Sequence, residues 1–264
     1  MGRLALVALS ALVLASSASG ASPNISAAHV VITIEPNGVV DILEDVTLAT
    51  PAAYTAAQEV SMHAGELFAQ PSVVVDERKL RSGDRPSKDT FVVSRGTRGV
   101  RISWTQPAGT STVRLGYRLA LVGTAYDDVV DMDVPLWESD WPGRVALLTG
   151  FFRLPRASLG TVRAWVEGTH AGGTLSSSQR DVRVRVHDIP PKRSLGLHVV
   201  FPRTVLTGTE GVVVKHGDGL AAILAARNLH PASTSWWWAA AVVLAVGLSA
   251  ALLRTARSRR QAQR

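Results

Sequence analysis

The stretch that decides the fold is HVVITIEPNGVVDILEDVTL, residues 29–48. His29 to Glu35 and Val39 to Leu48 are runs rich in β-branched residues, and Pro36-Asn37-Gly38 joins them. Asn-Gly between two such runs is the strongest short-range signal for a β-hairpin, because both residues tolerate the positive φ angles of a tight turn. This stretch therefore predicts a pair of antiparallel strands.

Further strand patterns follow as far as residue 201. The clearest is Ser111–Val122, where apolar residues at odd positions alternate with Arg114, Gly116 and Arg118. Such alternation is typical of a strand with one buried face. We expect a mainly β fold, an antiparallel β-sandwich built as one large module or as two tandem modules that divide near 123–125. The other predicted strands are Ser72–Glu77, Thr90–Ser94, Gly99–Trp104, Val129–Trp137, Val145–Leu154, Thr161–Val166, Val182–His187 and Leu195–Phe201, and a short helix is expected from Gly219 to Asn228.

Residues 1–20 have the pattern of a secretory signal peptide. Arg3 provides a positive start, Leu4 to Ala15 is a twelve-residue apolar core, and small residues follow up to Ala21. Twelve apolar residues are too few for a membrane span, which needs about 20. We expect cleavage near Ala18 to Ala21, which leaves residues 21–235 as an extracytoplasmic β-rich domain.

A second apolar block, Trp236–Leu253, has 18 residues without a charge. Tryptophans at one end and arginines at the other are typical of a single membrane-spanning helix whose basic end faces the cytoplasm. We therefore expect a single-pass protein of the cell membrane that contacts lipid through this helix, with a basic cytoplasmic tail at 254–264. The residues expected at the membrane interfaces are Trp236, Trp237, Trp238, Arg254 and Arg257.

The net charge of +7 is concentrated at the two ends of the chain. Of the 28 Lys and Arg residues, Arg3 and five in the last eleven positions lie outside the middle, and the 22 that remain nearly balance 21 acidic residues. Nucleic-acid binding needs a basic face on the folded domain, so no nucleic-acid partner is expected. The absence of cysteine excludes disulfides, thiol nucleophiles and cysteine-ligated metals.

The densest acidic stretch lies between positions 127 and 140. Its aspartates at 131 and 133 alternate with Met132 and Val134, which favours a solvated strand face over a calcium site, and no EF-hand spacing is present. At its end, two tryptophans bracket two carboxylates, an arrangement that suits carbohydrate stacking. The alternative is a pair of core aromatics that flank a turn. The candidate ligand surface consists of Trp137, Glu138, Asp140 and Trp141.

Several short motifs follow one another along the chain. They are Ile34–Val46, Leu115–Leu119, Leu136-Trp137, Trp141-Pro142, Phe152–Pro155, Trp165–Gly168 and Val200–Pro202. Their order resembles a family of predicted membrane proteins, domain of unknown function 2207. The resemblance covers about residues 29–205 and implies an extracytoplasmic β domain followed by membrane helices, with no catalytic residues.

No motif of an enzyme is present in the sequence. His-Glu-x-x-His, Gly-x-Ser-x-Gly, phosphate-loop and dinucleotide-binding patterns are all missing, so we expect no catalysis, no cofactor and no metal. The favoured hypothesis is an interaction module of the cell envelope with an envelope or membrane protein as partner. The alternatives are a domain that binds or senses a cell-wall glycan and, less favoured, an envelope hydrolase, because a Ser-His-Asp triad is defined by geometry and not by spacing.

Overall fold

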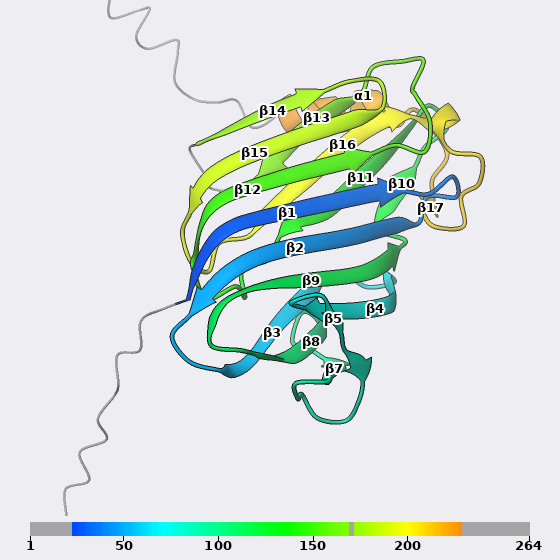
Figure 1. The fold of residues 1–264 in the computed structure, drawn as a ribbon. Helices are drawn as coiled ribbons and strands as arrows, with labels where there is room; N and C mark the ends of the chain where they lie inside the picture. The colour runs from blue at the N-terminus through cyan, green and yellow to red at the C-terminus, as the bar shows by residue number, and fades with distance from the viewer. Residues whose placement is uncertain (1–22, 169–171, 229–264) are drawn as a thin grey trace, which may run out of the picture. The chain divides into compact units, whose positions relative to one another are not determined.

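A computed structural model of the chain describes residues 23–168 and 172–228. The chain divides into two compact units, Met1–Gly219 and Leu220–Arg264. The strands of the first unit form three sheets (Figure 1). The prediction of a mainly β fold is confirmed.

The predicted hairpin consists of β1 (Asn24–Ile34) and β2 (Val40–Thr50), which pair antiparallel. In its turn the side-chain oxygen of Asn37 accepts a hydrogen bond from the backbone N–H of Val39 at 3.1 Å. Gly38 has a φ of 88°, and a Cβ there would lie 2.8 Å from a methyl carbon of Val212. Both conditions favour glycine, so the hairpin turn forms where the Asn-Gly pair predicts it, although only Gly38 of the pair has a positive φ.

An eight-stranded sheet grows from this hairpin, in the order β14-β15-β12-β1-β2-β9-β4-β5. Neighbouring strands are antiparallel except for β1 and β12, which run parallel with Ile32 in register with Phe152. The predicted antiparallel pairing is therefore wrong at this place, because β12 enters the free edge of β1 in the same direction as β1. The other strands of this sheet are β4 (Leu67–Val75), β5 (Arg78–Lys79), β9 (Gly109–Ala120), β12 (Arg144–Arg153), β14 (Gly173–Ser177) and β15 (Asp181–Ile189).

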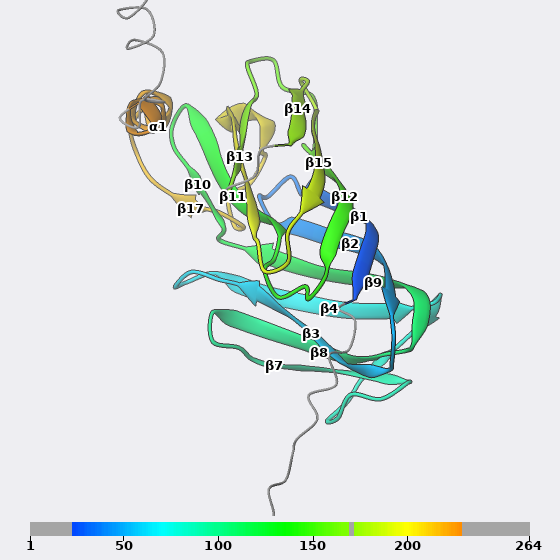
Figure 2. The ribbon, with the colours of Figure 1, turned by 90° about the vertical axis from the view of Figure 1, so that its left-hand side faces the viewer.

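Two smaller sheets accompany the large one (Figure 2). The five-stranded sheet has the order β13-β16-β11-β10-β17, and the four-stranded sheet has the order β3-β8-β7-β6. The position considered as a module boundary, 123–125, forms strand β10. The strands are β3 (Tyr54–Ser61), β6 (Arg81–Ser82), β7 (Thr90–Arg95), β8 (Gly99–Gln106), β10 (Gly123–Ala125), β11 (Val129–Trp137), β13 (Arg163–Glu167), β16 (Leu195–Pro202) and β17 (Val213–Val214), and a short 3-10 turn, Arg203–Val205, follows β16.

A hydrophobic core joins the three sheets. The rings of Phe152 in β12 and Phe201 in β16 lie 6.5 Å apart, which places the five-stranded sheet against the large sheet. In β9 the odd-numbered residues from Val113 to Leu119 are buried, as their alternation predicts. Arg114 lies on the opposite face, where its Nε donates to Asp45 at 2.6 Å.

The second unit is described only from Leu220 to Asn228, within helix α1 (Gly219–Asn228). This helix begins and ends where the sequence predicts. In the part of the chain that the structure describes, no helix is both long enough and apolar enough to cross a membrane. The expected signal peptide at 1–20, the span Trp236–Leu253, the tail at 254–264 and the five interface residues lie outside the described residues.

A carboxyl group lies buried between the large sheet and the four-stranded sheet. Both carboxylate oxygens of Glu44 in β2 accept from the side-chain amide of Gln58 in β3, at 2.9 and 3.0 Å, and one also accepts from the Tyr117 hydroxyl at 2.8 Å. Burial raises the pKa of Glu44 from 4.5 to about 7, against the lowering effect of these hydrogen bonds. This group links the two sheets and takes up a proton within the neutral pH range.

We expect the free energy of unfolding to fall as the pH rises from about 4.5 to about 7, because the folded state holds the proton of Glu44 more tightly than the unfolded state does. The shift corresponds to a loss of about 3 kcal/mol over this range. In Glu44→Gln the side chain cannot ionise, and its new amide can donate to the buried Gln58 Oε1, which has no partner among the described residues.

Urea unfolding of the membrane-free residues 21–235 at several pH values measures this dependence. The Glu44→Gln variant should lose most of the slope between pH 5 and pH 7, whereas Glu77→Gln, on an exposed turn, should keep it. An equal slope in both variants would assign the dependence to other groups.

Candidate functional site

The two tryptophans of the candidate ligand surface are buried. Trp137 and Trp141 are 3% and 4% exposed, and their rings stack at 5.3 Å with 15° between the planes. Trp104 of β8 lies 5.9 Å from Trp141, so the indoles fill the junction between β8 and the end of β11. Neither ring offers a face to a sugar. The predicted stacking surface is therefore wrong, and the alternative of core aromatics beside a turn describes these residues.

The two carboxylates between these tryptophans lie along the edge of the four-stranded sheet. Asp140 Oδ2 accepts from the backbone N–H of Glu59 at 2.9 Å, and Glu138 Oε1 accepts from that of Ser61 at 2.9 Å. Glu138 Oε2 also accepts from the Ser61 hydroxyl at 3.1 Å. Because Glu59 and Ser61 are two residues apart on β3, their N–H groups point the same way. The two acids thus bind consecutive outward donors of this edge strand.

Arg98, in the turn between β7 and β8, also contacts the residues of this edge and of the loop that binds it. Its guanidinium donates to Asp140 Oδ1 at 3.0 Å and to the Ser139 hydroxyl at 3.2 Å. Its backbone N–H donates to Glu59, and this bond lowers the pKa of the Glu59 carboxyl. Arg98 therefore joins the β7–β8 turn to the loop that follows β11.

Beside these contacts lies a cleft of about 190 Å³, which we call the three-sheet cleft because residues of all three sheets line it. Ser61, His63, Glu66 and Arg98 come from the four-stranded sheet and its loops, and Leu119 comes from the large sheet. The five-stranded sheet contributes Asp133, Val134, Pro135 and Trp137 of β11 and Leu195 and Gly196 of β16, and its flanks contribute Glu138 and Ser194. Of the predicted site residues, Trp137 and Glu138 reach this cleft.

The cleft collects more carboxylates than cations. Partial desolvation raises the pKa of Glu138 and, together with Glu167, that of Asp133. His63 Nδ1 lies 2.9 Å from Glu66 Oε1, and this hydrogen bond raises the pKa of the imidazole. Burial is the largest cause of both raised carboxyl pKa values, and a bound cation or hydrogen-bond donor would offset the desolvation of these groups. The cleft is therefore suited to a cationic or hydrogen-bond-donating group.

The acidic stretch from 127 to 140 does not form one cluster. Asp127 and Asp128 accept from the backbone N–H groups of Gly217 and Gly219, each at 2.7 Å. Asp133 is exposed on the outward face of β11, as predicted, whereas Asp131 is only partly exposed and forms an ion pair with His198. In the described ranges, no group of three or more His, Asp or Glu side chains is arranged to hold a metal ion.

Sequence reasoning found part of this site. It selected Glu138 and Asp140 from their density, but it did not single out Glu66 or Arg98, which are distant in sequence. His63 and Glu66, which lie three residues apart in one turn, were the sequence signal from which Glu66 could have been found.

These features define a β-rich domain with a polar cleft. A profile of the family described as "predicted membrane protein (DUF2207) N-terminal domain" matches residues 24–201, and the chain belongs to this family. The resemblance seen in the sequence is thereby confirmed. Among curated proteins, none matches this chain.

Three solved structures are similar in fold. A protein of Legionella pneumophila described as a nutrient-binding protein has 12% identity and a TM-score of 0.39, over 67% of this chain and 66% of its own. A protein of Parabacteroides distasonis described as a protease has 10% identity and a TM-score of 0.40, over 69% and 41%. An M1 zinc metallopeptidase from Deinococcus radiodurans has 10% identity and a TM-score of 0.38, over 69% and 43%. The chain thus spans less than half of the two peptidase chains.

Removal of either edge-binding carboxylate should loosen the four-stranded sheet. We expect Asp140→Ala to lower the free energy of unfolding by about 1–3 kcal/mol, because it leaves the N–H of Glu59 and the guanidinium of Arg98 without their acceptor. Amide hydrogen exchange at Glu59 and Ser61 should accelerate in this variant. Asp84→Ala, in an exposed loop, is the matched control and should change neither quantity.

Proposed function

We propose that this chain is a single-pass membrane protein whose β domain, residues 21–235, faces the outside of the cytoplasmic membrane. Three observations support the proposal. The family is described as predicted membrane proteins, the uncharged block Trp236–Leu253 has the composition of a span, and the arginines that follow favour a cytoplasmic tail. The domain would then meet its partner in the cell envelope.

The chain has no cysteine, so single cysteines can report its orientation. Ser94→Cys, exposed on β7, should react in intact cells with a maleimide that does not cross membranes. Ser258→Cys, in the expected tail, should react only after the membrane is opened. Labelling of Ser258→Cys in intact cells would contradict the proposed topology.

The proposed activity is recognition of a partner protein, not catalysis. The observation that carries it is the excess of carboxylates in the three-sheet cleft, where Glu66, Asp133 and Glu138 gather with Arg98. Arg98 is already engaged by Asp140 and Ser139, and His63 is engaged by Glu66, which leaves Asp133 and Glu138 for an incoming cation to balance. We therefore assign to the cleft a lysine or arginine side chain of an envelope or membrane protein.

The size of the cleft supports the same ligand. A volume of about 190 Å³ holds one long side chain and not an oligosaccharide. Its apolar lining, from Leu119, Val122 and Val134, suits the methylene groups of a lysine or arginine, whose charged end would then reach the acids. The burial of Trp137 and Trp141 removes the feature that favoured a glycan.

A photo-crosslinking residue at Ser194, which lines the cleft, should capture one membrane or envelope protein in living cells, and mass spectrometry should place the crosslink beside a lysine or arginine. Asp133→Lys in the same chain should lower the yield about tenfold by like-charge repulsion. Asp84→Lys should leave it unchanged. Equal yields from both variants, or no protein above background, would refute the assignment to the cleft.

A further inference from the structure

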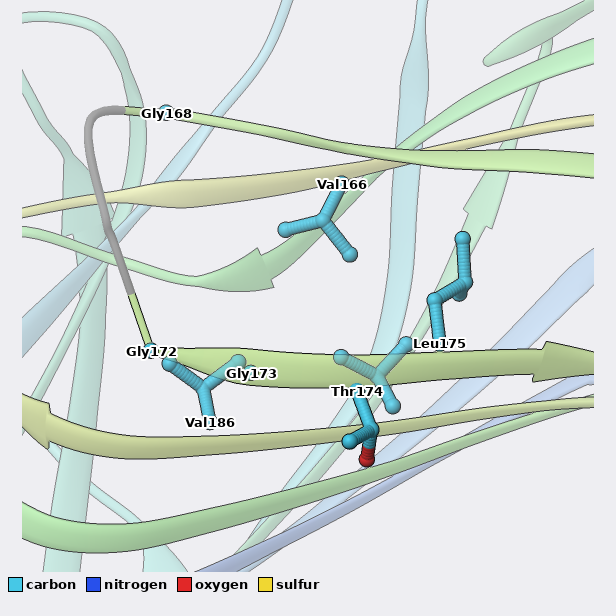
Figure 3. Close-up of a pocket in the computed structure, with 8 residues that line it drawn as sticks. Val166, Gly168, Gly172, Gly173, Thr174, Leu175 and Val186 are labelled. Atoms are coloured by element: carbon cyan, nitrogen blue, oxygen red, sulfur yellow. The ribbon is translucent and has the colours of Figure 1, made fainter.

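An open seam lies between two sheet edges. β13 is the last strand of the five-stranded sheet, and β14 is the last strand of the eight-stranded sheet. Figure 3 shows Val166 of β13 and Leu175 of β14 on opposite sides of the gap. The gap has a volume of about 220 Å³, and Val184 and Val186 of β15 also line it. An apolar hollow therefore separates the two edges here.

The backbone of β14 leaves hydrogen-bonding groups free at this edge. His187 N–H donates to Gly172 O at 3.1 Å, and Ser178 N–H donates to Asp181 O at 2.8 Å. Alternate residues of an antiparallel strand turn toward the partner strand, so Thr174 and Ser176 face β15. Gly173, Leu175 and Ser177 consequently direct their N–H and C=O groups to the open side.

Several other edges of the described sheets carry features that oppose strand addition. The edge of β3 is covered by Glu138 and Asp140, which accept its outward N–H groups. β5, β6 and β17 have two residues each, and β13 carries Arg163 and Glu167. By contrast, β14 has five exposed residues, none of them charged and none proline. Proteins usually block such an edge with charges or proline. The unblocked edge of β14 therefore indicates that another strand pairs with it.

Charge near this edge indicates what it accepts. Thr174 and Ser176 are paired with Arg185 and Arg183, which are exposed on the outer face of β15. Arg183 lies over the ring of Phe151 at 5.5 Å, and within the described ranges no carboxylate pairs with either arginine. Strands lie about 4.8 Å apart, so arginine side chains can reach across the small Thr and Ser to the outward residues of an added strand.

We propose that β14 is a docking edge for an extended segment of a partner protein in which apolar and acidic residues alternate. The segment pairs with the free backbone groups of Gly173, Leu175 and Ser177. Its apolar side chains enter the seam between Val166 and Leu175, and its acidic side chains meet Arg183 and Arg185. This mode of binding is β-strand addition, in which the backbone supplies affinity and alternate side chains supply specificity.

The full chain in lipid nanodiscs and a fluorescent peptide of about nine residues that alternates valine and glutamate test the proposal. We expect saturable binding by fluorescence anisotropy and slower amide exchange at Gly173, Leu175 and Ser177. A valine–lysine peptide should bind at least about tenfold more weakly, and N-methylation of alternate peptide bonds should abolish binding.

Leu175→Lys places a charge in the seam and should weaken binding at least about tenfold. Leu159→Lys is the matched control, because Leu159 is 99% exposed on a loop, and it should bind as the unaltered chain does. Asp133→Lys, in the three-sheet cleft, should also bind normally, which separates this proposal from the function proposed above.

Three outcomes would overturn the proposal. They are no saturable binding, equal binding of the lysine and glutamate peptides, and equal binding by Leu175→Lys and Leu159→Lys. The edge would instead be assigned to a second copy of the chain if the unaltered chain dimerised without binding the peptide and Leu175→Lys abolished the dimer.

Discussion

The structure depends on the need to shield one face of the eight-stranded sheet from water. This face carries the alternating apolar residues of β1, β2, β9 and β12, and burial of such side chains is the main favourable contribution to folding. No single sheet covers it. The five-stranded sheet packs near β12 through Phe152 and Phe201, and the four-stranded sheet joins β2 through Glu44 and Gln58. The three-sheet cleft lies where residues of these separate layers meet.

At the junction beside the three-sheet cleft, polar contacts join neighbouring elements, as apolar packing does elsewhere in the fold. The β3 edge, which a continuous sheet would have paired with another strand, is bound instead by two carboxylates, Glu138 and Asp140. Arg98 then connects one of these acids to the β7–β8 turn. Such connections leave room for a ligand, because side chains cover an edge less completely than a strand does. The proposed recognition in the cleft would therefore depend on atoms next to those that hold the four-stranded sheet together.

Local sequence patterns predicted much of the fold. The Asn37-Gly38 turn, the alternation in β9 and the ends of helix α1 follow from rules that act over a few residues. Strand β3 was missed because Gln58 and Glu59 are both buried there and no alternation survives. Strand β14 was missed because its small polar residues are typical of a loop. The parallel pairing of β1 with β12 and the division into three sheets depend on contacts that are distant in sequence.

The candidate site was less predictable than the fold. A dense acidic stretch drew attention to Glu138 and Asp140, but their ligands are backbone groups of β3, which no side-chain pattern reveals. Tryptophans such as Trp137 and Trp141 suit either a ligand-stacking surface or a hydrophobic core. Only their packing in the structure decides between these alternatives. Glu66 and Arg98 join the cleft through tertiary contacts.

The parallel pair at the centre of the large sheet also constrains the order in which the chain folds. The side chain of His29 meets Thr149, 120 residues further along, across this pair. While the chain is synthesised from its N-terminus, β1 can pair with β2 long before β12 exists, and its second edge stays exposed to other chains during that time. Pairings between distant segments form slowly, and exposed strand edges promote aggregation. The arrival of β12 therefore covers this edge of β1, and any delay in synthesis lengthens the interval in which the edge needs protection.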